Sequence, residues 1–232
     1  MTKFSVEKIS KVYKQKTALK TSSFDVEDGT CVVLCGGNGA GKSTMLQIMA
    51  GIIASSSGKT SINGKDLQYD RDNYLHEIGF MPDDFHAQET MTVEEFLSFY
   101  GSFRKVGKQR VAEVIELIGL TEKKREFIKS LSKGMRQRLL FGQSILAKPA
   151  VLLMDEPTNG LDPYWVNRFV EILNEMKKEG TIIVFSTHMM DVAAETGDVI
   201  LFLKQGEIFQ TIKNEGKAED TTMKLMKLHR YA

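Results

Sequence analysis

The sequence contains few cysteines and few prolines. Of its 232 residues, two are cysteine and four are proline. Cys31 and Cys35 lie four residues apart on a predicted strand, which at about 3.3 Å per residue separates them by roughly 13 Å. Because that distance is too long for a disulfide bond, we expect both to be small core residues, although a thiol beside the glycine-rich segment that follows could be alkylated.

Long hydrophobic runs are also missing. The apolar runs 151–154 and 199–203 are far shorter than the roughly 18 residues that a membrane-spanning helix needs. The N-terminal segment carries an acid at Glu7 and lacks the sustained apolar stretch of a secretion signal. We therefore expect a cytoplasmic chain that does not itself cross a bilayer.

An excess of one charge is absent as well. The 31 lysines and arginines nearly balance the 30 acids, for a net charge of +1, and no basic block occurs, so we expect no nucleic-acid partner. Hydrophobic residues make up 42% of the chain and charged residues 26%, which is ordinary for a globular protein. A chain of this length can bury one α/β core with a smaller lobe.

What the sequence does have is a glycine-rich segment directly after the apolar run 31–35, which predicts a buried strand. Residues 36–44 read GGNGAGKST and fit the pattern G-x-x-x-x-G-K-[ST] of phosphate-binding loops. We expect Lys42 to reach the outer phosphates of a nucleoside triphosphate and the Ser43 hydroxyl to help hold Mg²⁺. The residues predicted to form this cradle are Gly36, Gly37, Asn38, Gly39, Ala40, Gly41, Lys42, Ser43 and Thr44.

A pair of acids follows the predicted strand 151–154. Asp155 and Glu156 would lie at the C-terminal edge of a parallel sheet, where α/β proteins bind their ligands. One carboxylate can organise Mg²⁺, directly or through water, while the other orients or deprotonates an attacking water molecule. Upstream, Ser132 and Gly134 open a predicted helix whose N-terminus could face an anion, although a plain helix cap is the simpler interpretation of these two residues alone.

The order of predicted elements indicates the fold class. The first sixty or so residues alternate like strands, residues 92–95 (TVEE) form a capping box that opens a helical region, and later apolar runs alternate with helical patterns. We predict an α/β fold: a P-loop NTPase core with a parallel sheet, an antiparallel β layer and an inserted α-helical subdomain. One domain would span 1–232, with its core in 1–84 and 140–212, the helical subdomain in 85–139 and a C-terminal tail in 213–232.

Taken in order, these motifs resemble those of the nucleotide-binding subunits of ABC transporters, from Tyr13 to about Ile212. The phosphate loop matches the family's GPNGAGKST except at Gly37. Further matches are 131–137 with the LSGGQ signature, 151–157 with the second acidic motif, 159–162 with the D-loop and 186–188 with the switch-histidine segment. The resemblance therefore covers nearly the whole chain.

The resemblance implies a role for each of these residues. Tyr13 would stack on adenine, and Glu156 would be the general base. Asp155 and Ser43 would position Mg²⁺, and His188 would sense the γ-phosphate of ATP. Without the resemblance, Tyr13 would more simply be a packing residue on a strand, and His188 a hydrogen-bonded residue at a strand end.

The resemblance also implies a partner. Two copies, or this chain and a related ATPase subunit, would close head to tail over two ATP molecules. Ser132 and Gly134 of one copy would then contact the γ-phosphate of ATP held by Lys42 of the other, with the D-loop residue Asp162 close to the nucleotide.

Besides Gly37, three residues depart from the family pattern. Asp83 stands where the family usually has glutamine, and an acid there could still approach Mg²⁺ or water, so we include it among the nucleotide and metal residues. Lys133 and Met135 replace a glycine and the glutamine of the signature. Lys133 could point outward or add positive charge near the phosphates. An acid at position 83 and a lysine in the signature resemble the drug and antibiotic exporter branch.

The resulting prediction is an ATPase subunit that hydrolyses ATP with Mg²⁺ and drives a separate integral membrane permease, peripheral on the inner face of the cell membrane. Two alternatives stay open: an ABC-type ATPase in a non-transport assembly such as iron–sulfur cluster delivery, and a regulatory module that uses ATP only to dimerise. The aromatic residues at 96, 99, 100 and 103 belong either to the core of the helical lobe or to a groove for a permease helix.

Overall fold

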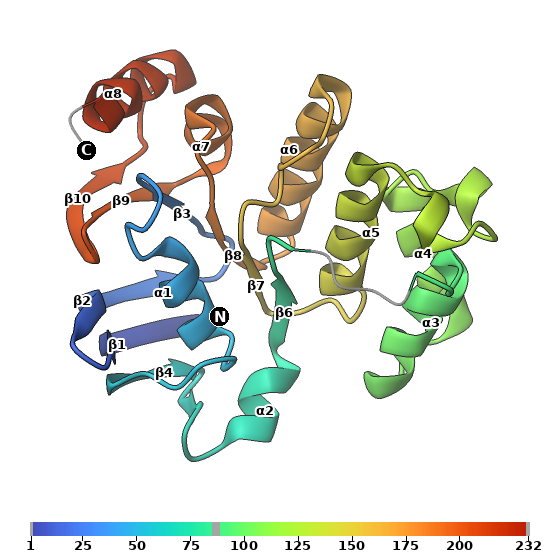
Figure 1. Ribbon diagram of the computed structural model, residues 1–232, viewed down its shortest axis with the longest axis horizontal. Coiled ribbons are helices and arrows are strands. Elements are labelled where there is room, and N and C mark those ends of the chain that lie inside the picture. Colours follow the sequence, from blue (N-terminus) through green and yellow to red (C-terminus); the bar gives the residue numbers. More distant parts are fainter. Residues whose placement is uncertain (1, 85–88, 231–232) are drawn as a thin grey trace.

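The computed structural model describes residues 2–84 and 89–230, which form two β-sheets, helices packed on them and a lateral group of helices (Figure 1). The strands are β1 (Lys3–Tyr13), β2 (Lys16–Glu27), β3 (Cys31–Cys35), β4 (Ser57–Ile62), β5 (Lys65–Asp66), β6 (Ile78–Met81), β7 (Val151–Met154), β8 (Ile182–Ser186), β9 (Val199–Lys204) and β10 (Glu207–Lys213). The helices are α1 (Lys42–Met49), α2 (Arg71–His76), α3 (Val93–Phe103), α4 (Lys108–Leu117), α5 (Lys133–Ile145), α6 (Pro163–Lys178), α7 (Met190–Thr196) and α8 (Ala218–Arg230), with short 3₁₀ turns at Thr121–Lys123 and Ile128–Ser130.

A six-stranded sheet with the order β10-β9-β3-β8-β7-β6 forms the centre of the fold. Neighbouring strands in it are parallel except for β10, which pairs antiparallel with β9. Strands β3, β7 and β8 are buried along their whole length, as expected of continuous apolar runs covered on both faces. A second, antiparallel sheet has the order β2-β1-β4-β5. The predicted fold class, with a parallel sheet and an antiparallel layer, is confirmed.

The two faces of the central sheet bury different sets of side chains, because successive residues of a strand point to opposite sides. On β3, Val32 and Leu34 pack with α1 and the antiparallel sheet, whereas Cys31, Val33 and Cys35 pack with the helices on the other face. Both cysteines are buried and free, as predicted. The central sheet is therefore the middle layer of the core.

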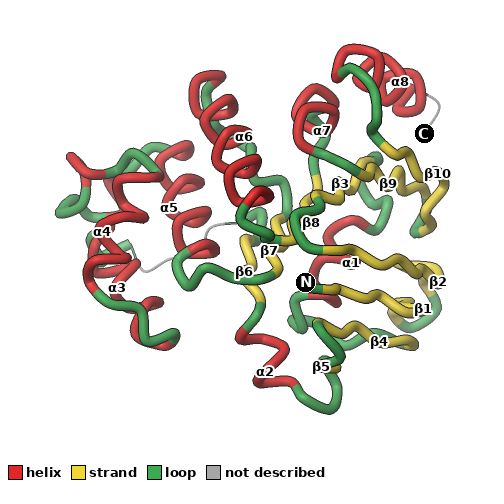
Figure 2. The backbone as a smooth tube through the Cα atoms, turned by 180° about the vertical axis from the view of Figure 1, so that it is seen from behind, coloured by secondary structure: helices red, strands yellow, loops and turns green. Residues whose placement is uncertain are grey.

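Helices α3, α4 and α5 form a group that lies at the opposite end of the molecule from α8, as Figures 1 and 2 show from both sides. The predicted capping box opens α3, since Thr92 accepts from the Glu95 backbone and the Glu95 side chain accepts from the Thr92 N–H. The predicted boundary between residues 139 and 140 falls inside α5. The reason is that α5 contacts β6 as well as α3 and α4, and so belongs to the core and to the helical group.

The carboxyl ends of β3, β6, β7 and β8 meet at one edge of the central sheet. The glycine-rich loop, the segment with Asp83, the acid pair and the segment with His188 directly follow these four strands. The parallel topology thereby gathers four motifs that are far apart in the sequence. Among the described residues, no helix has both the length and the apolarity needed to cross a membrane.

Candidate functional site

The glycine-rich loop connects β3 to α1 and is closely surrounded by neighbouring backbone. Gly36 has a φ of 143°, and a Cβ added there would stand 2.3 Å from the Leu203 carbonyl oxygen. Gly41 has a φ of 102°, and its Cβ would stand 2.9 Å from the carbonyl oxygen of Ala18. Both positions therefore require glycine. At Gly37, where the chain departs from the family's proline, a Cβ would meet nothing within 4 Å, so a larger residue also fits there.

The start of α1 suits an anion. The N-cap of α1 is Gly41, which has no side chain that could cap the helix, and the first turn of α1 holds no acidic residue. The first backbone N–H groups of a helix have no intrahelical partner and carry the positive end of its dipole. The loop therefore leads directly to a set of N–H groups that favours phosphate.

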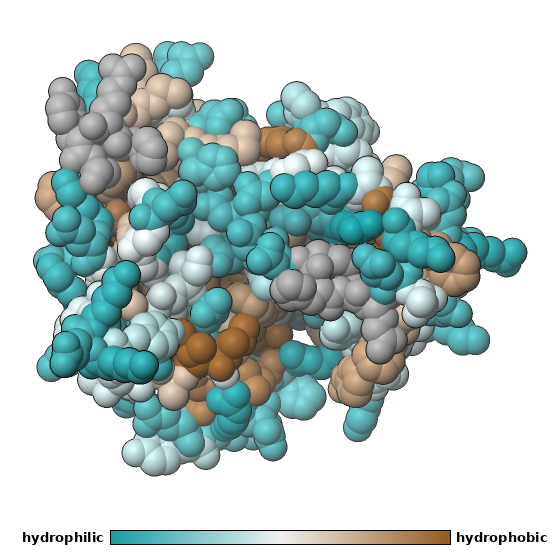
Figure 3. All heavy atoms as spheres, in the orientation of Figure 1, coloured by the Kyte–Doolittle hydropathy of each residue, from teal (hydrophilic) through white to brown (hydrophobic). Residues whose placement is uncertain are grey.

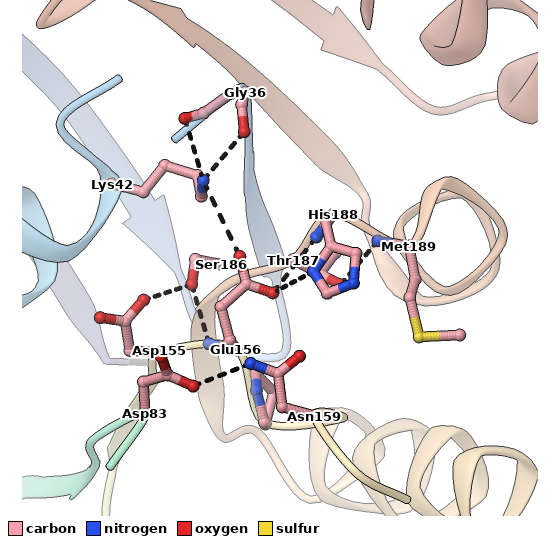
Figure 4. A network of polar contacts seen from close by, with 12 residues as sticks. Gly36, Lys42, Asp83, Asp155, Glu156, Asn159, Ser186, Thr187, His188 and Met189 are labelled. Atoms are coloured by element: carbon pink, nitrogen blue, oxygen red, sulfur yellow. Dashed lines mark hydrogen bonds and ion pairs between the residues drawn. The ribbon is translucent and has the colours of Figure 1, made fainter. Parts of the chain in front are cut away.

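Lys42 directs its ammonium group into the loop. Its Nζ donates to the carbonyl oxygens of Gly36 at 2.9 Å and Gly37 at 3.4 Å, and it lies 3.8 Å from Glu156 Oε1 (Figure 4). The Lys42 side chain is only 9% exposed. The cation is therefore held at the loop by weak acceptors and one carboxylate, all of which phosphate oxygens can replace.

Glu156 is held by groups from the end of β8 and from the segment that follows it. Its Oε2 lies 2.8 Å from His188 Nδ1 and accepts from the His188 backbone N–H at 3.3 Å. The Glu156 N–H donates to Ser186 Oγ at 2.9 Å, and this hydroxyl donates to Asp155 Oδ1 at 2.5 Å (Figure 4). The predicted general base therefore faces both the predicted phosphate lysine and the predicted switch histidine.

The predicted metal residues share one cavity. Ser43, Asp83 and Asp155 all line a hollow of about 810 Å³ that continues between the core and α3. Asp155 is buried, and Asp83 Oδ1 accepts from Asn159 Nδ2 at 2.8 Å. These hard oxygen donors fit Mg²⁺. Among the described residues no cluster of three or more His, Cys, Asp or Glu side chains could hold a metal by itself.

The signature residues Ser132, Lys133 and Gly134 lie outside this contact network. Ser132 is the N-cap of α5 and accepts from the Met135 N–H at 3.2 Å. A Cβ added at Gly134 would stand 2.7 Å from the carbonyl oxygen of Gly160, so the start of α5 packs directly on the loop that leads to α6. The aliphatic part of Lys133 lies over Gly160. This contact shows that the stem of Lys133 packs on its own chain.

Asp162 and Tyr13 lie at the border of the site. Asp162 caps α6 by accepting from the Trp165 N–H at 2.9 Å. Tyr13 ends β1 opposite Lys16 and is 47% exposed. The β1–β2 hairpin adjoins the glycine-rich loop through Ala18, whose carbonyl oxygen faces Gly41. Tyr13 thus presents an exposed ring on a hairpin that borders the loop.

The Cys35 thiol directly before the loop is unreactive near neutral pH. Burial raises its pKa to about 12, with Lys42 lowering it and Glu156 raising it by smaller amounts. Because the thiolate is the reactive form, a thiol with this pKa stays protonated near neutral pH. The alkylation that its position suggests is therefore not expected in the folded chain.

Three polar residues contribute to the site although no separate role for them is predicted from the sequence. Ser186 links Asp155 to the Glu156 backbone, Asn159 donates to Asp83, and Gln137 donates to the carbonyl oxygens of Glu156 and Pro157. Ser186 could have been found from the pattern, because it ends a strand beside β7 in a parallel sheet. Asn159 and Gln137 lie in the D-loop and signature matches, but the motifs do not predict their contacts with Asp83 and with the Glu156 loop.

The cavity that begins at the metal residues continues as a groove with aromatic walls. Phe96, Tyr100 and Phe103 line this cavity. Phe96 is buried, whereas Phe99 is 48% and Phe103 64% exposed. The Tyr100 ring contacts Phe96 and Phe99, and Phe99 contacts Phe103 directly. The aromatic cluster therefore belongs partly to the core of the helical group and partly to its surface. Figure 3 shows the molecule hollowed between the core and this end of α3, with apolar side chains beside the hollow.

Comparisons with known proteins agree with this arrangement. Residues 19–159 match the family described as ABC transporter. The linearmycin resistance ATP-binding protein LnrL of Bacillus subtilis (strain 168) is 34% identical over 206 residues, which cover 87% of this chain and 66% of LnrL. The chain thus spans about two thirds of that relative's length.

Solved structures extend the agreement to the fold. An ATP-binding subunit of an ABC transporter superposes with a TM-score of 0.86 at 26% identity, covering 96% of this chain and 99% of the other. The dimeric ATP-binding cassette MJ0796, in a post-hydrolysis state bound to ADP and Pi, gives a TM-score of 0.85 at 25% identity, covering 92% and 99%. The chain therefore belongs to the ABC transporter family and is one of its ATP-hydrolysing ATP-binding cassettes.

Proposed function

We propose that the chain is the ATPase subunit of an exporter and that it drives a separate integral membrane permease from the cytoplasmic face of the cell membrane. The observation that carries the proposal is the cluster of Lys42, Glu156 and His188 beside the glycine-rich loop. The cluster combines a cation for the phosphates with a carboxylate that can take a proton from water.

In this proposal the triphosphate of ATP lies in the loop 36–44, with Lys42 on its outer phosphates and adenine stacked on Tyr13. Ser43, Asp155 and Asp83 would hold Mg²⁺, which neutralises charge on the β- and γ-phosphates when it is bound. The shared cavity and the oxygen donors of these three residues support this assignment.

Hydrolysis would use Glu156 as general base. Its carboxylate accepts a proton from water as the water oxygen bonds to the γ-phosphorus and the bond to the bridging oxygen breaks, which releases ADP and Pi. His188, at 2.8 Å from Oε2, orients the carboxylate and senses the γ-phosphate. Lys42 leaves Oε1 for the phosphates, which frees that oxygen for water.

A second ATPase subunit, identical or related, would complete each site. Ser132, Gly134 and Asp162 lie outside the network around Lys42, so a head-to-tail partner is needed to bring such residues to the γ-phosphate. The dimeric form in which MJ0796 was solved with ADP and Pi supports this arrangement. A site completed only by closure keeps idle hydrolysis slow.

The aromatic groove is the proposed docking site for a permease helix. Arg104, directly after α3, donates to the carbonyl oxygens of Leu75, His76 and Ile78, which fixes the helical group to the core beside the groove. The exposed rings of Phe99 and Phe103 offer apolar surface for a helix. The name of LnrL, a resistance ATP-binding protein, favours export over the non-transport alternatives.

Purification from solubilised membranes tests the proposal. The chain should copurify with a membrane protein that contains several apolar segments of about 20 residues. Phe103→Asp should weaken that association, whereas Phe209→Asp, at an equally exposed ring on β10, should leave it intact. A chain that purifies from membranes without such a partner, or a complex indifferent to Phe103→Asp, would contradict the assignment to a permease.

A further inference from the structure

One face of α5 packs on the loop that carries Glu156. Gln137 is 5% exposed, and its Nε2 donates to the carbonyl oxygens of Glu156 and Pro157, each at 3.2 Å. One turn earlier, Gly134 meets the Gly160 carbonyl, which leaves no room for a side chain. Residues 134 and 137 lie on the same face of a helix because they are three apart. The start of α5 and this loop therefore form one packed unit.

The backbone of Glu156 needs such support. Its φ of 46° lies in the left-handed region, which residues other than glycine seldom adopt and which surrounding contacts must maintain. Its N–H donates to Ser186, and its carbonyl oxygen accepts from the Asn159 N–H at 3.1 Å as well as from Gln137. Among the described residues, the Gln137 amide is the donor to the Pro157 carbonyl oxygen.

We infer that Gln137 is a positioning residue for Glu156. Its amide fixes the strained backbone that directs the Glu156 carboxylate between Lys42 and His188. The inference rests on the proposed function, in which Glu156 is the general base. Because α5 is capped by Ser132, which we propose to meet the ATP of the second copy, Gln137 also connects that contact to the base of its own chain.

Gln137→Met tests the inference, since methionine has a similar length and no donor at its end. We expect kcat for ATP hydrolysis to fall between about tenfold and 100-fold, the range that small misplacements of catalytic groups produce. KM and the ATP dissociation constant should stay within about twofold, because Lys42 and the loop are untouched. Gln109→Met, at an exposed glutamine on α4, should leave both constants unchanged.

A second measurement separates positioning from general damage. In a Glu156→Gln background, adding Gln137→Met should not lower the residual single-turnover rate further, because the group that Gln137 orients is already gone. If Gln137→Met does not fold, Gln137→Asn, which is one methylene shorter, carries the same expectation.

Three results would overturn the inference: unchanged kcat in a folded variant, a raised KM with kcat kept, or an equal further loss in the Glu156→Gln background. Failure of the proposed function looks different. If Glu156→Gln alone retains full turnover, the base is misassigned, whereas an inactive Glu156→Gln together with a fully active Gln137→Met refutes only the role of Gln137.

Discussion

Replacing Glu156 with glutamine should stop turnover and tighten ATP binding at the same time. Glutamine keeps the shape of the side chain but cannot accept the proton of water, and loss of a general base typically lowers kcat by about 10²- to 10⁴-fold. The change also removes the negative charge that lies 3.8 Å from Lys42 Nζ and would repel phosphate. Removing this charge releases Lys42 to bind phosphate and ends the repulsion of phosphate by the carboxylate, so both effects favour ATP binding.

The size of the binding effect follows from that distance. At an effective dielectric constant of about 20, two unit charges so close attract by about 4 kcal/mol. The side chains are 9% and 14% exposed, so solvent screens part of this attraction. If about a third of it is recovered, roughly 1.4 kcal/mol, the ATP dissociation constant falls tenfold.

Titration calorimetry with ATP, at chain concentrations too low for dimers, measures this constant. Size-exclusion chromatography at higher concentration should show a trapped dimer. Glu171→Gln provides the matched control, because Glu171 is an exposed glutamate on α6 paired with Arg168. Undiminished hydrolysis by Glu156→Gln, or weaker ATP binding than in the parent chain, would refute the reasoning.

Three further predictions concern other parts of the chain. Asp83→Gln should leave ATP affinity largely intact in a binding titration, and complete loss would show that Asp83 is a primary ligand. Gly134→Ala should lower ATP-driven dimer formation and kcat despite the better helix propensity of alanine, because its Cβ would stand 2.7 Å from the Gly160 carbonyl oxygen; a fully active variant would contradict that contact. Burial raises the pKa of the Cys31 and Cys35 thiols to about 12, from 9.0 when exposed. Between pH 9 and pH 12 the thiols stay protonated in the folded chain but ionise in the unfolded chain. The free energy of unfolding therefore falls in this range by about 1.4 kcal/mol per pH unit for each thiol, and the full contribution of the thiols is present below pH 9. Urea unfolding measures this change: from about pH 8 to about pH 10, the variant with alanine at both positions should lose less stability than the parent chain. Equal losses in the two proteins would contradict the prediction.

Local signals explain why much of the fold could be predicted. The central strands are continuous apolar runs, which is what burial on both faces demands, and the caps at Thr92 and Ser132 act within one turn of a helix. The extent of α5 could not be predicted in the same way. It depends on simultaneous contacts with β6 and with α3 and α4, which are remote in the sequence.

The candidate site likewise combines residues that could be predicted from the sequence with contacts that could not. The motifs located Lys42, Glu156 and His188, and the parallel sheet brings the three side chains together. The bond between Asp83 and Asn159 joins residues 76 positions apart, so the motifs that contain these two residues do not predict their contact. The predicted roles of Ser132 and Gly134 require a second copy and stay predictions for experiment.

A mixing experiment tests most directly whether ATP is held between two copies. Lys42→Ala removes the phosphate lysine, and Ser132→Asp keeps the helix cap but places a negative charge where we propose the γ-phosphate lies. Each variant alone should be inactive. In an equal mixture, half of the dimers combine both variants and contain one intact composite site, so turnover should recover to about a quarter of the parent rate if the two sites act independently. If the mixture stays as inactive as its components while mixed dimers form, ATP is not shared between Lys42 of one copy and Ser132 of the other.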